Sequence, residues 1–161
     1  MKALLPCLLI VAATQAAPAM AEPAAHSPLL GTWAVDVSRL PFPPESRPKS
    51  VIFTFTEVVG GKWRTDVDIK GGDGSERTMS STCALDGSPC RITGDTMEAD
   101  RGAMKLPQPN VLVIALTKSA SPASTRVYAV SPDARSMVET AVYFTDDGKP
   151  ILRTNYFSRV R

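Results

Sequence analysis

The sequence predicts an all-β protein, an antiparallel meander of about 8–10 strands that closes into a barrel. Short strand-like segments are separated by turn signals such as "KGGDGS", "PQPN" and "DDGK". The segment "KWRTDVDIK" (residues 62–70) alternates between apolar and polar residues, as a half-buried strand does. Beyond the N-terminal region, no segment has a sustained helical period of apolar residues. Closure is expected because it leaves no exposed strand edges.

The first strand is expected to begin at Gly31. The strands expected after it are 51–58, 62–70, 76–85, 90–93, 102–106, 111–118, 124–130, 136–144 and 151–160. Four prolines in "LPFPPESRP" (residues 40–48) exclude a helix or a central strand there. We therefore expect a long connection, which could cover one end of the fold. Residues 94–101 are compatible with either a short helix or a loop.

Two hairpins allow a prediction of register. A tight Gly60-Gly61 turn would place Phe55 opposite Asp66, so we predict a bulge or a longer turn that shifts the register by one residue. In the last hairpin, a two-residue turn at Asp147-Gly148 would pair Tyr143 with Leu152. Neither face of that hairpin is purely apolar. Both a barrel with a partly polar lumen and a half-filled barrel with a wet exterior would show this pattern.

The N-terminus has the features of a secretory signal. Lys2 precedes an apolar run at residues 3–13, and Ala19-Met20-Ala21 has the small-x-small form of a cleavage site. A buried N-terminal helix is the alternative, and the prolines in this region argue against it. We expect residues 1–21 to be a cleaved signal peptide, 22–28 a flexible leader and 29–161 a single barrel domain. The protein is then periplasmic or secreted.

Composition excludes some classes of partner. The formal net charge is +2, and there is no run of Lys or Arg of the kind that nucleic-acid-binding proteins use. No segment after the signal is long and apolar enough to predict a membrane-spanning helix. We therefore expect neither a nucleic-acid partner nor a membrane span, and the oligomeric state stays open.

The two cysteines outside the signal lie in "CALDGSPC". A type I′ turn at Asp86-Gly87 would place Cys83 directly opposite Cys90, at a Cα separation that a disulfide accepts. A structural disulfide is the expected outcome in an oxidising compartment. A redox-active role is the alternative, but the C-x-x-C spacing is absent.

The segment "GTWAVDVS" resembles the first-strand Gly-x-Trp signature of the calycins, the group of lipocalins, fatty-acid-binding proteins and avidins. The chain is also similar to small exported bacterial proteins. The calycin resemblance implies that Gly31 and Trp33 belong to the closed end of a barrel, with a basic side chain of the last strand over the tryptophan. In "FSRVR" that side chain is Arg159 or Arg161. In a closed meander the first and last strands are antiparallel neighbours, so residues near 159 approach Trp33, where a cation–π contact is expected.

The resemblance also implies a ligand, a small amphipathic or hydrophobic molecule bound or carried in the barrel. Fatty-acid-binding proteins hold a carboxylate with Arg-x-Tyr on the last strand. Here "TRVY" lies two strands earlier, and the last strand has an arginine and a tyrosine at a different spacing. Because arginine grips carboxylates bidentately and tyrosine adds a donor, four residues are candidate ligand-binding groups. They are Arg126, Tyr128, Arg153 and Tyr156.

Catalytic chemistry has few candidates in this chain. The single histidine, His26, falls in the expected leader, so we predict no histidine-based triad, no metal site and no cofactor. A binding protein is therefore favoured over an enzyme. The main alternative is a protein-interaction module, an inhibitor or envelope accessory factor, with a filled barrel. A barrel enzyme is the least favoured of the three.

Overall fold

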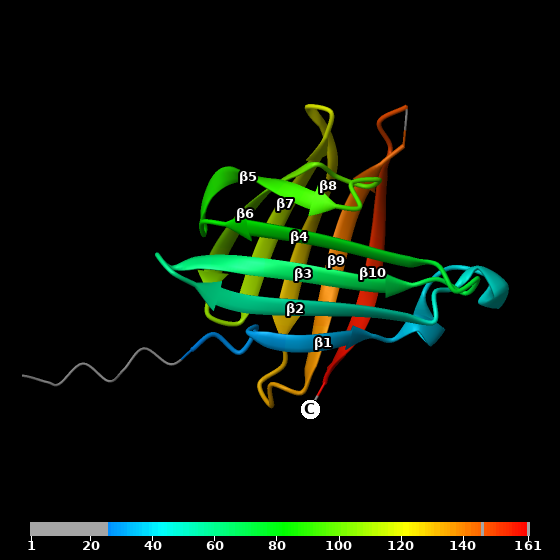
Figure 1. Cartoon of the computed structure of the whole chain (residues 1–161), viewed down its shortest axis with the longest axis horizontal. Coiled ribbons are helices and arrows are strands. Elements are labelled where there is room, and N and C mark those ends of the chain that lie inside the picture. Colours follow the sequence, from blue (N-terminus) through cyan, green and yellow to red (C-terminus); the bar gives the residue numbers. More distant parts are fainter. Residues whose placement is uncertain (1–25, 146, 161) are drawn as a thin grey trace, which may run out of the picture.

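The computed structural model describes residues 26–145 and 147–160, in which ten antiparallel strands form a closed barrel (Figure 1). The predicted signal peptide lies outside the described residues. Each strand pairs with its neighbours in sequence, and β1 pairs with β10 to close the meander. The predicted all-β meander barrel is thus confirmed. The strands are β1 (Gly31–Val35), β2 (Ser50–Val58), β3 (Lys62–Lys70), β4 (Glu76–Cys83), β5 (Asp86–Gly94), β6 (Arg101–Gln108), β7 (Val111–Lys118), β8 (Ser121–Val130), β9 (Ser136–Phe144) and β10 (Pro150–Arg159).

The β2–β3 hairpin has the shifted register that the sequence predicts. Phe55 pairs with Thr65, and Phe53 pairs with Val67. The connection after Val58 includes two glycines with positive φ, +81° at Gly60 and +66° at Gly61, a conformation that costs other residues strain. This longer turn moves Asp66 and Asp68 away from Phe55 and Phe53, and it places Phe53 opposite Val67 on the inner face of the barrel.

Closure of the barrel brings Trp33 on β1 opposite Arg159 on β10. The indole is fully buried, and the guanidinium carbon of Arg159 lies 4.1 Å from the centroid of the ring. A Cβ on Gly31 would lie 2.7 Å from a guanidinium nitrogen of Arg159, and Gly31 has a φ of +115°. Glycine is therefore required here by both the backbone conformation and the close approach of Arg159.

Four aromatic side chains form the centre of the core. Phe53 lies 5.4 Å from Phe157 and 6.1 Å from Tyr128, measured between ring centroids. Phe55 lies 5.8 Å from Tyr128 in an edge-to-face arrangement. These are favourable geometries for aromatic pairs. The cluster therefore joins side chains of β2, β8 and β10 across the barrel interior.

The disulfide joins Cys83 at the end of β4 to Cys90 on β5, with their Cα atoms 5.2 Å apart. The predicted type I′ turn between them is absent. Such a turn needs a positive φ at both central residues, and Gly87 has one (+90°) whereas Asp86 does not. Asp86 instead pairs with Lys105 of β6. The start of β5 is thus paired with β6 and not with β4, and the disulfide supplies the link between β5 and β4.

The last hairpin differs by one residue from the predicted pairing. Phe144 pairs with Pro150 and Tyr143 with Ile151, so the connection between β9 and β10 is longer than a two-residue turn. The amide of Thr145 donates to the carbonyl of Lys149 (2.9 Å). Because side chains alternate along a strand, this one-residue shift exchanges the two faces of β10 relative to β9.

Residues 36–48, here called the mouth segment, form most of the connection between β1 and β2. They contain two short 3-10 turns, Val37–Arg39 and Pro44–Ser46. The expected long connection is present, but the expectation that its prolines exclude any helical turn is wrong, because Pro44 occupies the first position of the second turn, where proline is tolerated. The segment lies against one end of the barrel, beside the β3–β4 turn (Figure 1).

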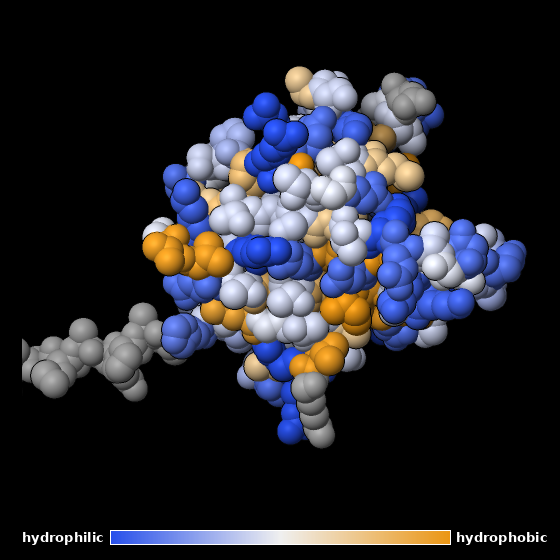
Figure 2. All heavy atoms as spheres, in the orientation of Figure 1, coloured by the Kyte–Doolittle hydropathy of each residue, from blue (hydrophilic) through white to orange (hydrophobic). Residues whose placement is uncertain are grey.

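Polar side chains cover most of the face shown in Figure 2, with smaller hydrophobic patches between them. The most exposed large apolar residues include Val59, Met97, Phe144 and Leu152. Residues 95–100, for which the sequence left helix and loop open, form a loop. None of the helices described is long and apolar enough to cross a membrane.

Candidate functional site

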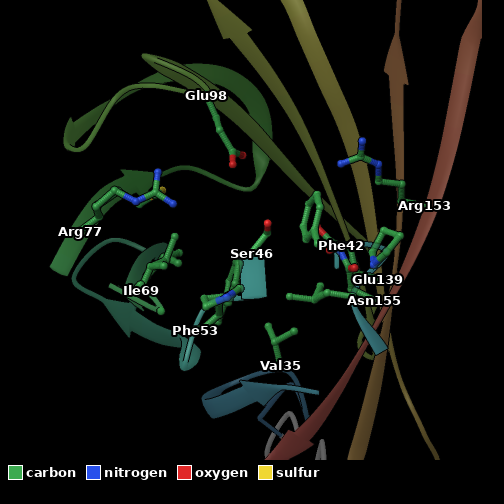
Figure 3. A pocket seen from close by; sticks show the side chains of 18 of the residues that line it. Val35, Phe42, Ser46, Phe53, Ile69, Arg77, Glu98, Glu139, Arg153 and Asn155 are labelled. Atoms are coloured by element: carbon green, nitrogen blue, oxygen red, sulfur yellow. Dashed lines mark hydrogen bonds between the residues drawn. The ribbon is translucent and has the colours of Figure 1, made fainter. Parts of the chain in front are cut away.

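The main cavity of the described structure occupies the barrel interior at the mouth segment and has a volume of about 580 Å³. Side chains from the two sides of the barrel point toward one another across it (Figure 3). Phe42 and Ser46 of the mouth segment line it, together with residues 71–73 of the β3–β4 turn. The cavity therefore lies at the end of the barrel that the mouth segment covers.

One wall of this cavity is apolar. It is formed by inward-facing residues of β1, β2 and β3, which alternate with outward-facing residues of the same strands. These wall residues are Val35, Val51, Phe53, Val67 and Ile69. A wall of this kind can bind the hydrocarbon part of a ligand.

The opposite wall is polar and centres on Glu139 of β9, which is only 1% exposed. Asn155 of β10 donates from Nδ2 to Oε2 of Glu139 (2.5 Å). Arg126 of β8 donates from Nη1 to Oε1 of the same carboxylate (3.4 Å). A carboxylate so deeply buried requires such donors, because burying it without a partner would cost roughly several kcal/mol.

Arg126 also reaches the loop after β5, where its Nη2 donates to Oε2 of Glu98 (2.7 Å). Burial disfavours the charge of Arg126, but the negative groups around it outweigh that effect and raise its pKa. Burial also raises the pKa of the Tyr128 hydroxyl well above 10, and the charge of Glu139 adds to the shift. Arg126 is therefore a paired cation, and Tyr128 is a neutral phenol.

Arg153 of β10 has a different environment. Its guanidinium carbon lies 5.2 Å from the ring centroid of Tyr143 and 5.7 Å from that of Phe42. Among residues 26–145 and 147–160, no carboxylate forms an ion pair with it. Burial raises the pKa of Tyr143, and the charge of Arg126 partly offsets this effect. The cavity thus presents one guanidinium that no carboxylate of the described residues neutralises, next to a phenol that can donate a hydrogen bond.

The four candidate ligand-binding residues have different positions. Arg126 and Arg153 line the cavity. Tyr128 is fully buried deeper in the barrel, beyond the main cavity. Tyr156 does not line the cavity, because strand alternation places its side chain on the outer face of β10, where the guanidinium carbon of Arg39 lies 3.2 Å from its ring centroid.

The register of the last hairpin explains the position of Tyr156. The two-residue turn would have set Tyr156 opposite Glu139, on the same face. In the structure Asn155 pairs with Glu139, and Tyr156 pairs with Val138 on the outside. The one-residue shift therefore brings an amide, and not a phenol, against the buried carboxylate.

Sequence reasoning missed five residues of the site: Phe42, Glu98, Glu139, Tyr143 and Asn155. Glu139 carried a usable signal, because it lies between buried Met137 and Ala141 at the alternation expected for one strand face. An acid on an otherwise inward-facing row of side chains is a candidate functional group. Phe42 and Glu98 lie in connecting segments, where no periodicity indicates which way a side chain points.

Within the part of the chain that the structure describes, no three His, Cys, Asp or Glu side chains are grouped so as to hold a metal ion. No model of a known protein family matches the sequence, and no curated protein matches it at a significant level. The chemistry of the cavity is therefore the basis for a functional inference.

Proposed function

We propose that the protein binds a small amphipathic molecule in this cavity, with an anionic head group on Arg153 and an apolar body against β1–β3. The observation that carries the proposal is the guanidinium of Arg153, which lines a cavity of about 580 Å³ without a carboxylate partner among the described residues. Arginine binds carboxylates and related anions with two parallel hydrogen bonds.

The division of the cavity into two walls supports an amphipathic ligand. The hydrophobic residues Val51, Phe53 and Ile69 face a polar wall that includes Tyr143 and Arg153. A purely apolar ligand would leave Arg153 desolvated without a partner, which is costly. A small, fully charged ligand would leave the apolar wall uncovered.

The volume of the cavity also supports a small-molecule ligand. Ligand pockets in proteins measure about 300–1,000 Å³, and the volume of about 580 Å³ is within that range. A barrel filled by its own side chains would have favoured the alternative function, a protein-interaction module. The cavity therefore supports a carrier or binding protein over that alternative.

The test compares decanoate with decanol, which share an apolar chain and differ in the charge of the head group. Both are titrated by displacement of the anionic dye anilinonaphthalene sulfonate from the wild type and from Arg153→Gln. Wild type is expected to bind decanoate more tightly, and Arg153→Gln to lose about 10–100-fold in decanoate affinity with little change for decanol.

Arg101→Gln is the matched control, because Arg101 is an exposed arginine of β6 that does not line the cavity. It should bind both compounds as the wild type does. Failure of the wild type to bind either compound, or equal loss of both in Arg153→Gln, would contradict the proposal. Native mass spectrometry of the protein purified from its own compartment tests independently for a bound small molecule.

A further inference from the structure

A second, smaller chamber of about 80 Å³ lies deeper in the barrel than the main cavity. The two spaces share lining residues, among them Phe53, Met79 and Arg126. The deep chamber is therefore adjacent to the main cavity, on the side of β4–β8. Most of its lining is hydrophobic, including Cys83, Met104 and Ile114.

Thr65 of β3 lines this deep chamber and is 8% exposed. Its Oγ1 is buried and forms no hydrogen bond with any described group of the protein. Among the described residues it is the one buried side-chain polar atom without a hydrogen-bond partner, whereas other buried polar groups such as Glu139 have partners. Buried hydroxyls nearly always have partners, since an unsatisfied one costs free energy.

Alternation along β3 places the side chain of Thr65 inside the barrel. Thr65 lies between Trp63 and Val67 on the inward row of β3, where both neighbours are apolar. Valine has nearly the same shape and would fill the same space without burying a hydroxyl. The position of the hydroxyl, in the wall of a chamber large enough for a few atoms, is therefore informative about what enters that chamber.

We infer that the deep chamber is a subsite for a polar atom at the inner end of the ligand. This atom forms a hydrogen bond with Oγ1 of Thr65. This inference rests on the proposed function. The ligand class becomes a chain with polar groups at both ends: an anion at Arg153 and a hydroxyl or carbonyl oxygen at Thr65. The apolar wall of the main cavity contacts the hydrocarbon between them.

The experiment uses fatty acids from octanoate to tetradecanoate and their ω-hydroxy counterparts, each titrated by dye displacement. At the chain length that spans the two subsites, the ω-hydroxy acid should bind wild type about two- to tenfold more tightly than the plain acid. Thr65→Val should abolish this preference while retaining affinity for the plain acid. Thr65→Ser, which keeps the hydroxyl, should retain the preference.

Thr82→Val is the matched control, because Thr82 is an exposed threonine on the neighbouring strand β4. It should keep the preference for the ω-hydroxy acid. Thermal unfolding of ligand-free Thr65→Val should show a melting temperature equal to or above that of wild type, which separates lost binding from lost folding.

Each remaining outcome overturns the inference in a distinguishable way. If wild type binds plain acids and shows no ω-hydroxy preference at any chain length, the subsite is wrong and the proposed function stands. If the preference persists in Thr65→Val, Thr65 is not the group that recognises the inner polar atom. If wild type binds none of the acids, both the inference and the proposed function fail.

Discussion

Arg159 covers the indole of Trp33 and joins three separate parts of the chain at the end of the barrel away from the cavity. Its Nε donates to the carbonyl of Ala134 (2.7 Å) and its Nη1 to that of Leu30 (2.9 Å). Its Nη2 donates to the carbonyl of Pro28. The indole itself donates from Nε1 to the carbonyl of Leu29 (2.8 Å). This pair of side chains therefore holds the segment before β1 and the β8–β9 turn against the barrel.

Trp33→Ala should lower the free energy of unfolding by about 3–5 kcal/mol, because it removes a fully buried aromatic side chain. Arg159→Lys should cost about 1.5–3 kcal/mol, since lysine keeps the charge and cannot reach all three carbonyls. Urea denaturation measures both. Dye binding by the folded fraction should be unchanged, so a Trp33→Ala variant of normal stability that no longer binds the dye would show that the tryptophan contacts ligand.

The disulfide between Cys83 and Cys90 closes a short loop, with a sequence separation of 7. Replacing both cysteines with alanine should reduce the free energy of unfolding by about 2–3 kcal/mol, from the chain entropy of a loop of that length. Dithiothreitol should lower the melting temperature of wild type and leave that of the double variant unchanged. A wild type insensitive to the reductant, with all thiols shown to be free, would mean that the bridge contributes nothing.

Gly94→Ala should be strongly destabilising, because Gly94 has a φ of +83° and a Cβ there would clash with the carbonyl oxygen of Thr78. The expected cost combines left-handed strain of about 1–2 kcal/mol with an overpacking cost of about 1–3 kcal/mol. Gly74→Ala is the control, since Gly74 has a φ of +87° and nothing within 4 Å of the added atom. Equal effects of the two substitutions in urea denaturation would rule out the clash with Thr78.

Stability should decrease at high pH because of Tyr128. Burial raises the pKa of its hydroxyl in the folded state above the ordinary value of about 10. Between the unfolded and folded pKa values the unfolded chain loses the proton and the folded chain keeps it, so the free energy of unfolding falls as pH rises above about 10. The free energy of unfolding of Tyr128→Phe, measured by urea denaturation, should fall less steeply with pH above about 10 than that of wild type. An unchanged slope would assign the alkaline loss of stability to other groups.

Stability should also decrease in acid, through aspartates that accept hydrogen bonds in turns. The Ser131 hydroxyl and the Arg135 amide lower the pKa of Asp133. Its contribution is present above the unfolded pKa of about 3.9 and is lost as pH falls through the lower folded value. Asp133→Asn should therefore show a smaller loss of stability between about pH 5 and pH 3, measured by thermal unfolding.

Local patterns in the sequence predicted much of the fold. β3, β7 and β9 have the predicted bounds, since each lies between two turn signals, and β3 also alternates between apolar and polar residues. The shifted β2–β3 register followed from the mismatch of Phe55 with Asp66 in a tight turn. Hydrophobic matching across one hairpin is a local property, so the chain itself carries the information.

The composition of the site could not be predicted in the same way. No feature of the mouth segment indicates that Phe42 approaches Arg153, because irregular segments have no side-chain periodicity. Arg126 and Glu98 are far apart in the chain, and they meet only because the barrel closes around them.

By itself, the sequence determined that strands form, where most of them run, and which cysteines and which tryptophan stabilise their ends. These features depend on neighbours along the chain or directly across a hairpin. The tertiary structure alone decided that Asn155, and not Tyr156, faces Glu139, and that Thr65 is buried without a partner. The physical reason is that the inner face of a strand is set by the length of the loop before it, and the contents of a barrel are set by all its strands together.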